Sequence, residues 1–210
     1  MRLRRCILTV LCCIPLLIAA QPRLAEPEMC FGFHGGVIGS MVRFNPNVAQ
    51  SFAPPVLGAN GGFVFRYSRT KYTAVQLELD YMRRGWHESA TDYYRYLDYI
   101  EIPLLMHLYV GKKVRGFLNL GPQFGYCIAQ SDKNGEGLSG HQYESVAKPW
   151  DWGLAAGLGL QVNTNKAGVY FLEARFDFSF GDLYPNRVAD YFRTSAPMAL
   201  SLNIGWLFAK

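Results

Sequence analysis

The strongest constraint on the fold is an alternation of apolar and polar side chains with a period of two residues. Residues 72–82 show it most clearly. One face of this segment is apolar and carries Val75, Leu77, Leu79 and Tyr81. The other face carries Ala74, Gln76, Glu78 and Asp80. A strand places such residues on two opposite faces, whereas a helix scatters them around its circumference. The pattern therefore predicts β-strands.

Eight segments carry this alternation. They are residues 31–42, 59–68, 72–82, 97–110, 114–127, 151–163, 169–180 and 197–208. Each reaches the roughly 9–11 residues that a tilted strand needs to cross a bilayer. Short connections at 68–71, 111–113 and 164–167 alternate with long ones at 43–58, 85–96, 128–150 and 181–196. Short and long connections on opposite rims are typical of bacterial outer-membrane barrels.

Alternation alone does not say which face of a barrel points inward, because a soluble barrel with an apolar interior also alternates. Aromatic residues gather at both predicted rims, as in the interfacial belts of membrane barrels. One rim has Tyr67, Tyr72, Tyr109 and Phe208. The other has Tyr81, Trp86, Tyr126, Trp152 and Phe180. We therefore favour the membrane barrel, with the charged face lining its lumen.

The predicted fold is all-β: an eight-stranded antiparallel up-and-down transmembrane β-barrel with short periplasmic turns and long outer loops. An additional hairpin within residues 128–150 is an alternative that would make ten strands. The barrel domain spans residues 31–208, and residues 21–30 form a short periplasmic segment before it.

Residues 1–20 are expected to be a secretory signal peptide. Arg2, Arg4 and Arg5 precede an apolar stretch over residues 6–19, and small residues follow at Ala19 and Ala20. An uncleaved membrane anchor is the alternative. Cleavage removes three arginines and no acids, so the formal net charge falls from +5 to +2. With no basic stripe remaining, we expect no nucleic-acid partner. The expected location is the bacterial outer membrane.

Two cysteines, Cys30 and Cys127, remain after the signal. The strand assignment places them at opposite ends of the barrel, and a disulfide needs Cα atoms within about 7 Å. We therefore predict two free thiols.

The candidate site is the set of charged residues on the luminal face. Its members are Arg66, Glu78, Asp80, Glu101, Arg115, Glu173, Arg175 and Asp177. Eight strands enclose an interior just wide enough for side chains, so we expect these groups to form a structural polar network. The alternative is a proton or substrate path, because ionisable groups at membrane depth can mark function. Some of the acids are expected to share a proton or to bind trapped water.

No catalytic, metal-binding or phosphate-binding motif is present, so we expect no enzyme activity and no cofactor or metal. His107 with Glu101 and Ser179 could be arranged as a lipid hydrolase. That arrangement fails, because His107 falls near the periplasmic end of the lumen and Ser179 near the outer end.

The longest loop, residues 128–150, is polar and glycine-rich. It is either a solvated variable loop or a contact for ligand, partner or lipopolysaccharide. Tyr93, Tyr94 and Tyr96 are either a recognition patch or part of an aromatic belt.

Several sequence elements resemble the PorT-like outer-membrane β-barrel family of Bacteroidetes-type bacteria. They are residues 77–85 (LELDYMRRG), 99–105 (YIEIPLL), 120–122 (LGP), 152–159 (WGLAAGLG) and 172–176 (LEARF). The resemblance covers most of the chain from Phe31 to Phe208. It implies a non-enzymatic outer-membrane protein, and the family's namesake is linked to protein secretion across the outer membrane.

The expected function is therefore a structural or accessory role in protein secretion or envelope assembly. Expected partners are outer-membrane lipid, lipopolysaccharide, and secretion-system or envelope proteins. The alternatives are a binding or adhesion module that acts through the surface loops, a small solute channel, and an outer-membrane lipid-modifying enzyme.

Overall fold

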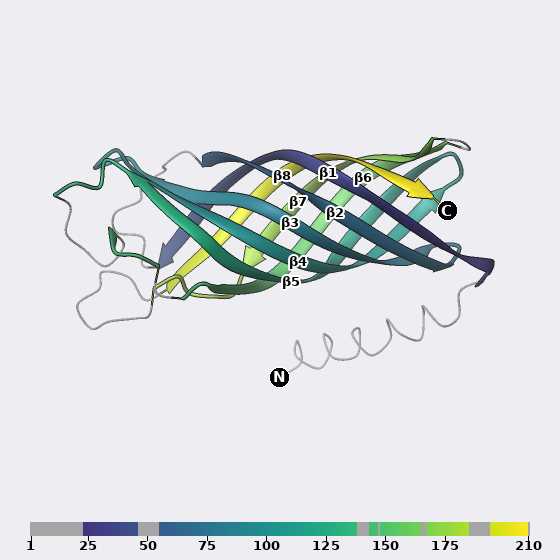
Figure 1. Cartoon of the computed structure of the whole chain (residues 1–210), viewed down its shortest axis with the longest axis horizontal. Coiled ribbons are helices and arrows are strands. Elements are labelled where there is room, and N and C mark those ends of the chain that lie inside the picture. The colour runs from purple at the N-terminus through teal and green to yellow at the C-terminus, as the bar shows by residue number, and fades with distance from the viewer. Residues whose placement is uncertain are drawn as a thin grey trace, which may run out of the picture.

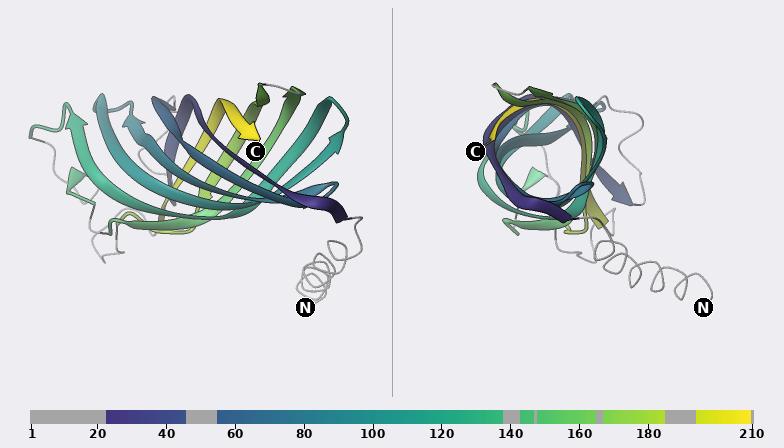
Figure 2. Two further views of the ribbon diagram at one scale, coloured as in Figure 1. Left: turned by 45° about the vertical axis from the view of Figure 1, so that its right-hand side comes forward. Right: turned by 90° about the vertical axis from the view of Figure 1, so that its right-hand side faces the viewer.

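The chain forms a closed barrel of eight antiparallel strands (Figures 1 and 2). The computed structural model describes residues 23–45, 55–137, 143–146, 148–164, 167–184 and 194–209. The strands are β1 Arg23–Asn45, β2 Val56–Thr70, β3 Thr73–Glu88, β4 Tyr93–Gly111, β5 Val114–Lys133, β6 Trp150–Thr164, β7 Gly168–Ser179 and β8 Thr194–Ala209. The predicted fold class is confirmed. The predicted signal peptide, residues 1–20, lies outside the described residues.

Each strand pairs with its sequence neighbours, and β1 closes the ring against β8. The closing register runs from Cys30↔Ala209 to Asn45↔Thr194. The right-hand view of Figure 2 looks along the axis and shows the closed ring. Closure leaves no sheet edge, so the ladder hydrogen bonds are satisfied within the barrel wall.

The two faces of the wall differ in polarity. On β7 the outward Leu172 and Phe176 are exposed, whereas the inward Glu173 and Arg175 are buried. The same division holds on β6 and β8, where Leu158 and Ile204 are 68% and 69% exposed. A soluble barrel would have the opposite polarity. An apolar outer wall around a polar interior is the arrangement that a bilayer stabilises. Among the described residues, no helix is long and apolar enough to cross a membrane.

Aromatic side chains mark one level of the outer wall near the end with the long connections. Tyr126, Trp152 and Phe180 point outward there and are 41%, 55% and 45% exposed. Two residues assigned to the belts from sequence are placed differently. Trp86 and Tyr109 are buried on the inner side of the wall. The sequence analysis placed both in the aromatic belts because they lie close to a strand end. Their positions in the alternation of β3 and β4, however, direct them inward.

The strands of one sector run well beyond this aromatic level. The predicted loop over residues 85–96 is wrong, because β3 continues to Glu88, β4 starts at Tyr93, and only residues 89–92 turn between them. β5 likewise extends to Lys133, although its pairing with β6 ends at Tyr126↔Trp150. Residues 82–88, 93–99 and 127–133 therefore form an outer protrusion, seen at the left of Figure 1.

The first strand is also longer than the sequence predicted. β1 begins at Arg23, so most of the predicted separate segment 21–30 belongs to the first strand. The described residues of the longest predicted loop contain no additional strand beyond the extension of β5 and the start of β6.

Cys30 and Cys127 are both free, as predicted, and lie toward opposite ends of the barrel.

The inward face of β6 carries several small residues, which leave room for side chains from the neighbouring strand β7. Gly157 is the clearest case. A Cβ atom at this position would lie 1.9 Å from Oε1 of Glu173. That carboxylate cannot simply move away, because Arg175 and Asn119 both donate hydrogen bonds to it.

We predict that Gly157→Ala destabilises the barrel by about 1–3 kcal/mol, because the added methyl group displaces the Glu173 carboxylate. The midpoint of urea unfolding in lipid vesicles, followed by tryptophan fluorescence, measures the change. Gly116→Ala is the matched control, since a Cβ at Gly116 meets nothing within 4 Å. Equal midpoints for the two variants would show that the interior tolerates the additional volume.

Candidate functional site

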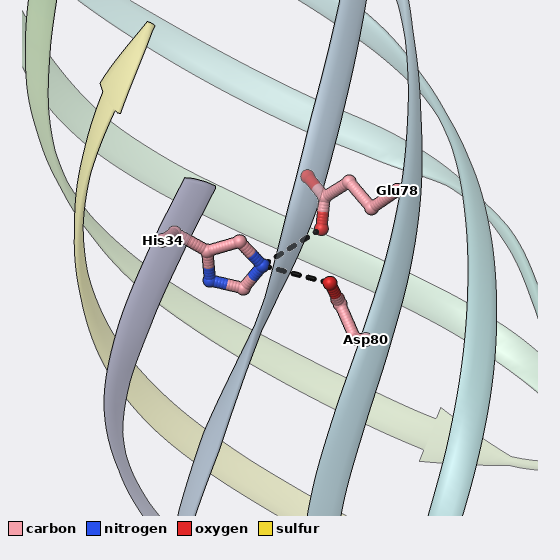
Figure 3. Close-up of side chains that lie close together, drawn as sticks. All are labelled: His34, Glu78 and Asp80. Atoms are coloured by element: carbon pink, nitrogen blue, oxygen red, sulfur yellow. Dashed lines mark hydrogen bonds and ion pairs between the residues drawn. The ribbon is translucent and has the colours of Figure 1, made fainter. Parts of the chain in front are cut away.

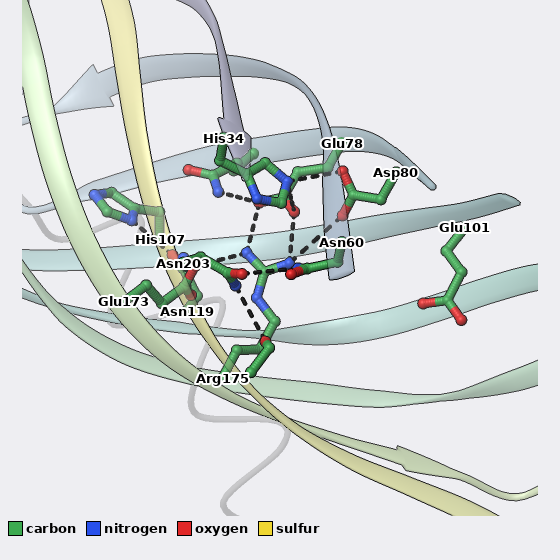
Figure 4. Close-up of polar contacts among 12 residues, drawn as sticks. His34, Asn60, Glu78, Asp80, Glu101, His107, Asn119, Glu173, Arg175 and Asn203 are labelled. Carbon is green, nitrogen blue, oxygen red and sulfur yellow. Dashed lines mark hydrogen bonds and ion pairs between the residues drawn. The ribbon is translucent and has the colours of Figure 1, made fainter. Parts of the chain in front are cut away.

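The centre of the lumen is occupied by an ion pair that crosses the barrel. Arg175 of β7 donates hydrogen bonds to both carboxylate oxygens of Glu78 on β3, at 2.6 and 2.8 Å. The two strands are not neighbours in the barrel, so these side chains span the lumen (Figure 4). Arg175 also donates to Glu173 at 2.7 Å. Charge-assisted bidentate pairs of this kind are strong and geometrically specific.

His34 of β1 joins the same centre (Figure 3). Its Nε2 atom lies 2.8 Å from Asp80 and 3.7 Å from Glu78. With an ionised Asp80, this nitrogen is protonated and donates a hydrogen bond to the carboxylate. His34, Glu78 and Asp80 also bring three ligand atoms within 4.8 Å of one another, close enough to suggest a metal site. Arg175 lies 3.7 Å from Asp80 and binds Glu78 directly. A metal cation here would face that guanidinium, so the residues fit an ion-pair network better.

Amide side chains extend the network to the remaining wall. Asn119 donates to Glu173 at 2.7 Å and accepts from Nδ1 of His107 at 2.6 Å. Arg66 donates to Gln76 at 2.7 Å and to Gln161 at 2.8 Å, and Gln76 donates to Glu78. Asn60 and Asn203 are bonded to each other at 2.7 Å. All eight strands thus contribute to one polar interior, in which these groups are buried.

A second layer lies nearer the outer end. Arg84 of β3 lies 2.8 Å from Glu101 and 3.1 Å from Asp151, and Ser179 donates to Asp151 at 2.6 Å. Arg84 was missed in the sequence analysis, because residues 85–96 were assigned to a loop and the strand was ended at residue 82. Its even position, shared with Glu78 and Asp80 on one face of β3, is the signal that identifies it.

Seven of the eight predicted luminal residues lie buried on the inner face. They are Arg66, Glu78, Asp80, Glu101, Glu173, Arg175 and Asp177. Arg115 is the exception, because it lies half-buried at the rim with the short turns. It stacks over the Tyr109 ring at 5.0 Å, donates to the Lys112 carbonyl, and makes no ion pair with a described residue. His34 and Asp151 are further luminal groups that the sequence analysis omitted.

The buried interior holds more acids than bases. In the central network and the second layer, the described acids are Glu78, Asp80, Glu101, Asp151, Glu173 and Asp177, and the described arginines are Arg66, Arg84 and Arg175. One more buried acid, Glu88, and one more buried arginine, Arg95, lie in the outer protrusion. Asp177 has no hydrogen bond to its buried Oδ2 atom. Uncompensated buried charge is costly, so this imbalance agrees with the hypothesis that some acids hold protons or water.

Among the described residues, an apolar cluster lies at the outer mouth of the lumen. Its buried members are Val42, Trp86, Tyr93, Leu97, Tyr99, Cys127, Val146, Leu183 and Tyr184. Arg95 of the outer protrusion donates to the carbonyls of Tyr143 and Glu144. The Val146 N–H donates to Gln130 at 2.8 Å, and the Tyr184 hydroxyl donates to Glu144 at 3.1 Å. Burial raises the pKa of Tyr184, although a hydrogen bond from Arg95 opposes this. Residues 143–146 and 181–184 therefore pack against the outer protrusion at the mouth of the lumen, and we call these two segments the cap.

Tyr93, Tyr94 and Tyr96 separate across the two faces of β4. Tyr93 is fully buried against the cap. Tyr94 lies on the opposite face, where it stacks on His87 at 4.0 Å and lies parallel to Tyr96 at 6.4 Å. His107 and Ser179, considered above as parts of a hydrolase, bind different partners in separate layers.

We predict that Arg175→Gln destabilises the barrel by about 3–5 kcal/mol, because it leaves the carboxylates of Glu78 and Glu173 buried without their cation. Asp177→Asn on the same strand is the matched variant. It removes one unpaired buried carboxylate, so stability should be unchanged or increased. Urea unfolding in vesicles measures both variants. Similar losses for the two would contradict the assigned network.

Comparison with known proteins identifies the family of the barrel. A family model described as the outer membrane protein beta-barrel domain matches residues 20–184. No curated protein matches the chain. Solved structures with the same general architecture include OprG of Pseudomonas aeruginosa, Neisserial surface protein A, and Ail, the attachment invasion locus protein of Yersinia pestis.

OprG is 12% identical, with 90% of this chain and 98% of OprG covered and a TM-score of 0.47. Neisserial surface protein A is 12% identical, with 85% and 97% covered and a TM-score of 0.46. Ail is 17% identical, with 86% and 99% covered and a TM-score of 0.44. At this identity the likeness concerns the fold alone.

Proposed function

Since the chain belongs to the outer membrane protein beta-barrel domain family, we propose that it is a sealed, non-enzymatic barrel of the bacterial outer membrane with a structural or accessory role in protein secretion or envelope assembly. The observation that carries this proposal is the Arg175–Glu78 ion pair across the lumen. The PorT-like motifs at residues 77–85 and 99–105 support the secretion role. Export through a cleaved signal at residues 1–20 is part of the same proposal.

The closed interior argues against a solute channel. The lumen is filled at its centre by Arg175, Glu78 and Glu173, and near the outer end by Arg84 with Glu101. The cap then covers the outer mouth with apolar side chains. A hydrated solute would have to displace three separate sets of contacts, two of them charged and buried.

The interior also argues against catalysis. A nucleophile needs a base within hydrogen-bond reach. The Asp151 carboxylate that accepts from Ser179 is already paired with Arg84, and His107 is bound to Asn119, away from Ser179. Both side chains are buried and face the lumen, where membrane lipid does not reach them.

The outer protrusion is the part of the described chain best suited to meet a partner. It stands beyond the aromatic level of the wall, and its inner face is held by the cap. Its outer face carries His87, Tyr94 and Tyr96 in a stacked row, with the Lys133 ammonium 5.9 Å from the Tyr94 ring. Rigid aromatic groups of this kind often anchor protein interfaces. Below this level, the apolar wall and aromatic belt suit contact with outer-membrane lipid and lipopolysaccharide.

A surface-binding or adhesion module is the second candidate, favoured by the same row of stacked, partly buried rings. The two candidates differ in the location of the partner. An accessory role places the partner in the cell's own envelope, and adhesion places it on another surface.

We predict that the purified protein gives no steady conductance in planar bilayers, because the lumen is filled and capped. An open porin reconstituted in the same way serves as the positive control. A reproducible ohmic conductance step from the purified protein would replace the proposal with the channel alternative.

We also predict that a photo-crosslinking amino acid at Tyr94 captures a discrete envelope protein in living cells of the native bacterium. Leu158, which faces lipid, and Lys112, on a short periplasmic turn, are the control positions. Adducts from Lys112 alone would move the contact to the periplasmic side. Adducts from Tyr94 only when other cells or surfaces are present would favour adhesion.

A further inference from the structure

An oblique groove crosses the outer wall near the end with the short turns. Its lining comes from four adjacent strands, β2 to β5. The lining residues are Tyr67, Arg69, Thr70, Thr73, Ala74, Val75, Leu104, Leu105, Met106, Leu120, Gly121 and Pro122. Most of them are apolar, and the outward Val75, Leu104 and Leu120 are 51%, 45% and 43% exposed. The groove therefore lies on the wall that faces the bilayer.

The cause of the groove is local to β4 and β5. The register pairs Pro103 with Gln123 and then Met106 with Leu120, leaving out Leu104 and Leu105. Gly121 and Pro122 stand opposite these two leucines. Pro122 has no N–H to donate to a ladder, and Gly121 has no side chain. Because these two positions carry so little side chain, the wall is thin here, between the larger side chains of Leu120 on β5 and Leu104 on β4.

One end of the groove is charged. Arg69 lines it and is exposed, and Lys71 is exposed in the adjoining turn between β2 and β3. Neither side chain forms a hydrogen bond or ion pair with another described residue. Glu28, which pairs with Ser68 in the register, is the nearest acid along the neighbouring strand. Strand parity directs Glu28 to the inner side of the rim and Arg69 to the outer side.

A second groove on the outer wall provides a contrast. It is lined by Phe31, Phe33, Phe63, Phe65, Leu77, Leu79, Ile102 and Phe208 together with Gly32, Val64 and Glu78. The only ionisable member, Glu78, is buried in the luminal network. This groove offers apolar contacts alone. The groove ending at Arg69 combines an apolar channel with Arg69 and the adjoining Lys71, two cations that have no partner among the described residues.

We propose that the groove ending at Arg69 and Lys71 binds one anionic phospholipid of the inner leaflet of the outer membrane. The acyl chain lies along Val75, Leu104 and Leu120, and the phosphate group meets Arg69 and Lys71 at the periplasmic rim. The short turns face the periplasm in this class of barrel, so the cations stand at the depth of phospholipid headgroups. Basic residues at a membrane surface attract anionic lipids, and their long side chains extend readily into the headgroup region. The site is independent of the outer protrusion.

Native mass spectrometry of the detergent-purified protein tests the site, with phosphatidylglycerol and phosphatidylcholine of identical acyl chains as probes. We expect one phosphatidylglycerol to be retained in preference to phosphatidylcholine. Arg69→Gln with Lys71→Gln should lower the retention of phosphatidylglycerol on the order of tenfold. The retention of phosphatidylcholine should fall much less, because its ammonium group already offsets the charge of its phosphate. Val75→Trp fills the groove without changing charge and should lower the retention of both lipids.

Lys112→Gln with Lys113→Gln is the matched control, because it removes the same charge from a neighbouring short turn that does not line the groove. A heat-modifiable band on gels checks that each variant remains folded. Equal retention of the two lipids by the unaltered protein would overturn the proposal. An equal loss in the Lys112 and Lys113 variant would also overturn it, since the effect would then belong to the whole rim.

Discussion

The need to satisfy every backbone N–H and C=O group within hydrocarbon is the constraint on which the rest of this structure depends. The chain meets it by closing β1 against β8, which removes both sheet edges. Closure divides every strand into a face toward lipid and a face toward the lumen. The apolar outer wall and the polar interior are two consequences of this single requirement.

Eight strands make the enclosed space narrow, and this decides what the interior can do. Long charged side chains from one wall reach the opposite wall, as Arg175 reaches Glu78. Small residues such as Gly157 create the room that their partners fill. A buried ion pair is weak evidence for net stability, because desolvation offsets much of the attraction. Its clearer consequence is that buried side chains occupy the lumen between β3 and β7, and this is the basis for proposing that function lies at the outer surfaces.

The described outer surfaces offer two different chemistries at the two ends. The outer protrusion presents stacked aromatic rings on a sheet that the cap holds from behind. The periplasmic rim presents exposed cations, and at Arg69 these meet an apolar groove. These two chemistries are the basis for proposing a macromolecular partner at the first surface and a lipid at the second.

The sequence by itself determined the strand number, the closed membrane barrel, the two free thiols and most of the inward-facing charges, because period-two alternation is a local property of each strand. Only the tertiary structure decided the extent of β3 to β5, since Trp86 and Tyr93 become buried through contacts with distant loop residues such as Tyr184. It also decided which charges meet. Parity places Arg175 and Glu78 on the same inner face, but only barrel curvature and strand stagger bring β7 and β3 within hydrogen-bond distance across the lumen.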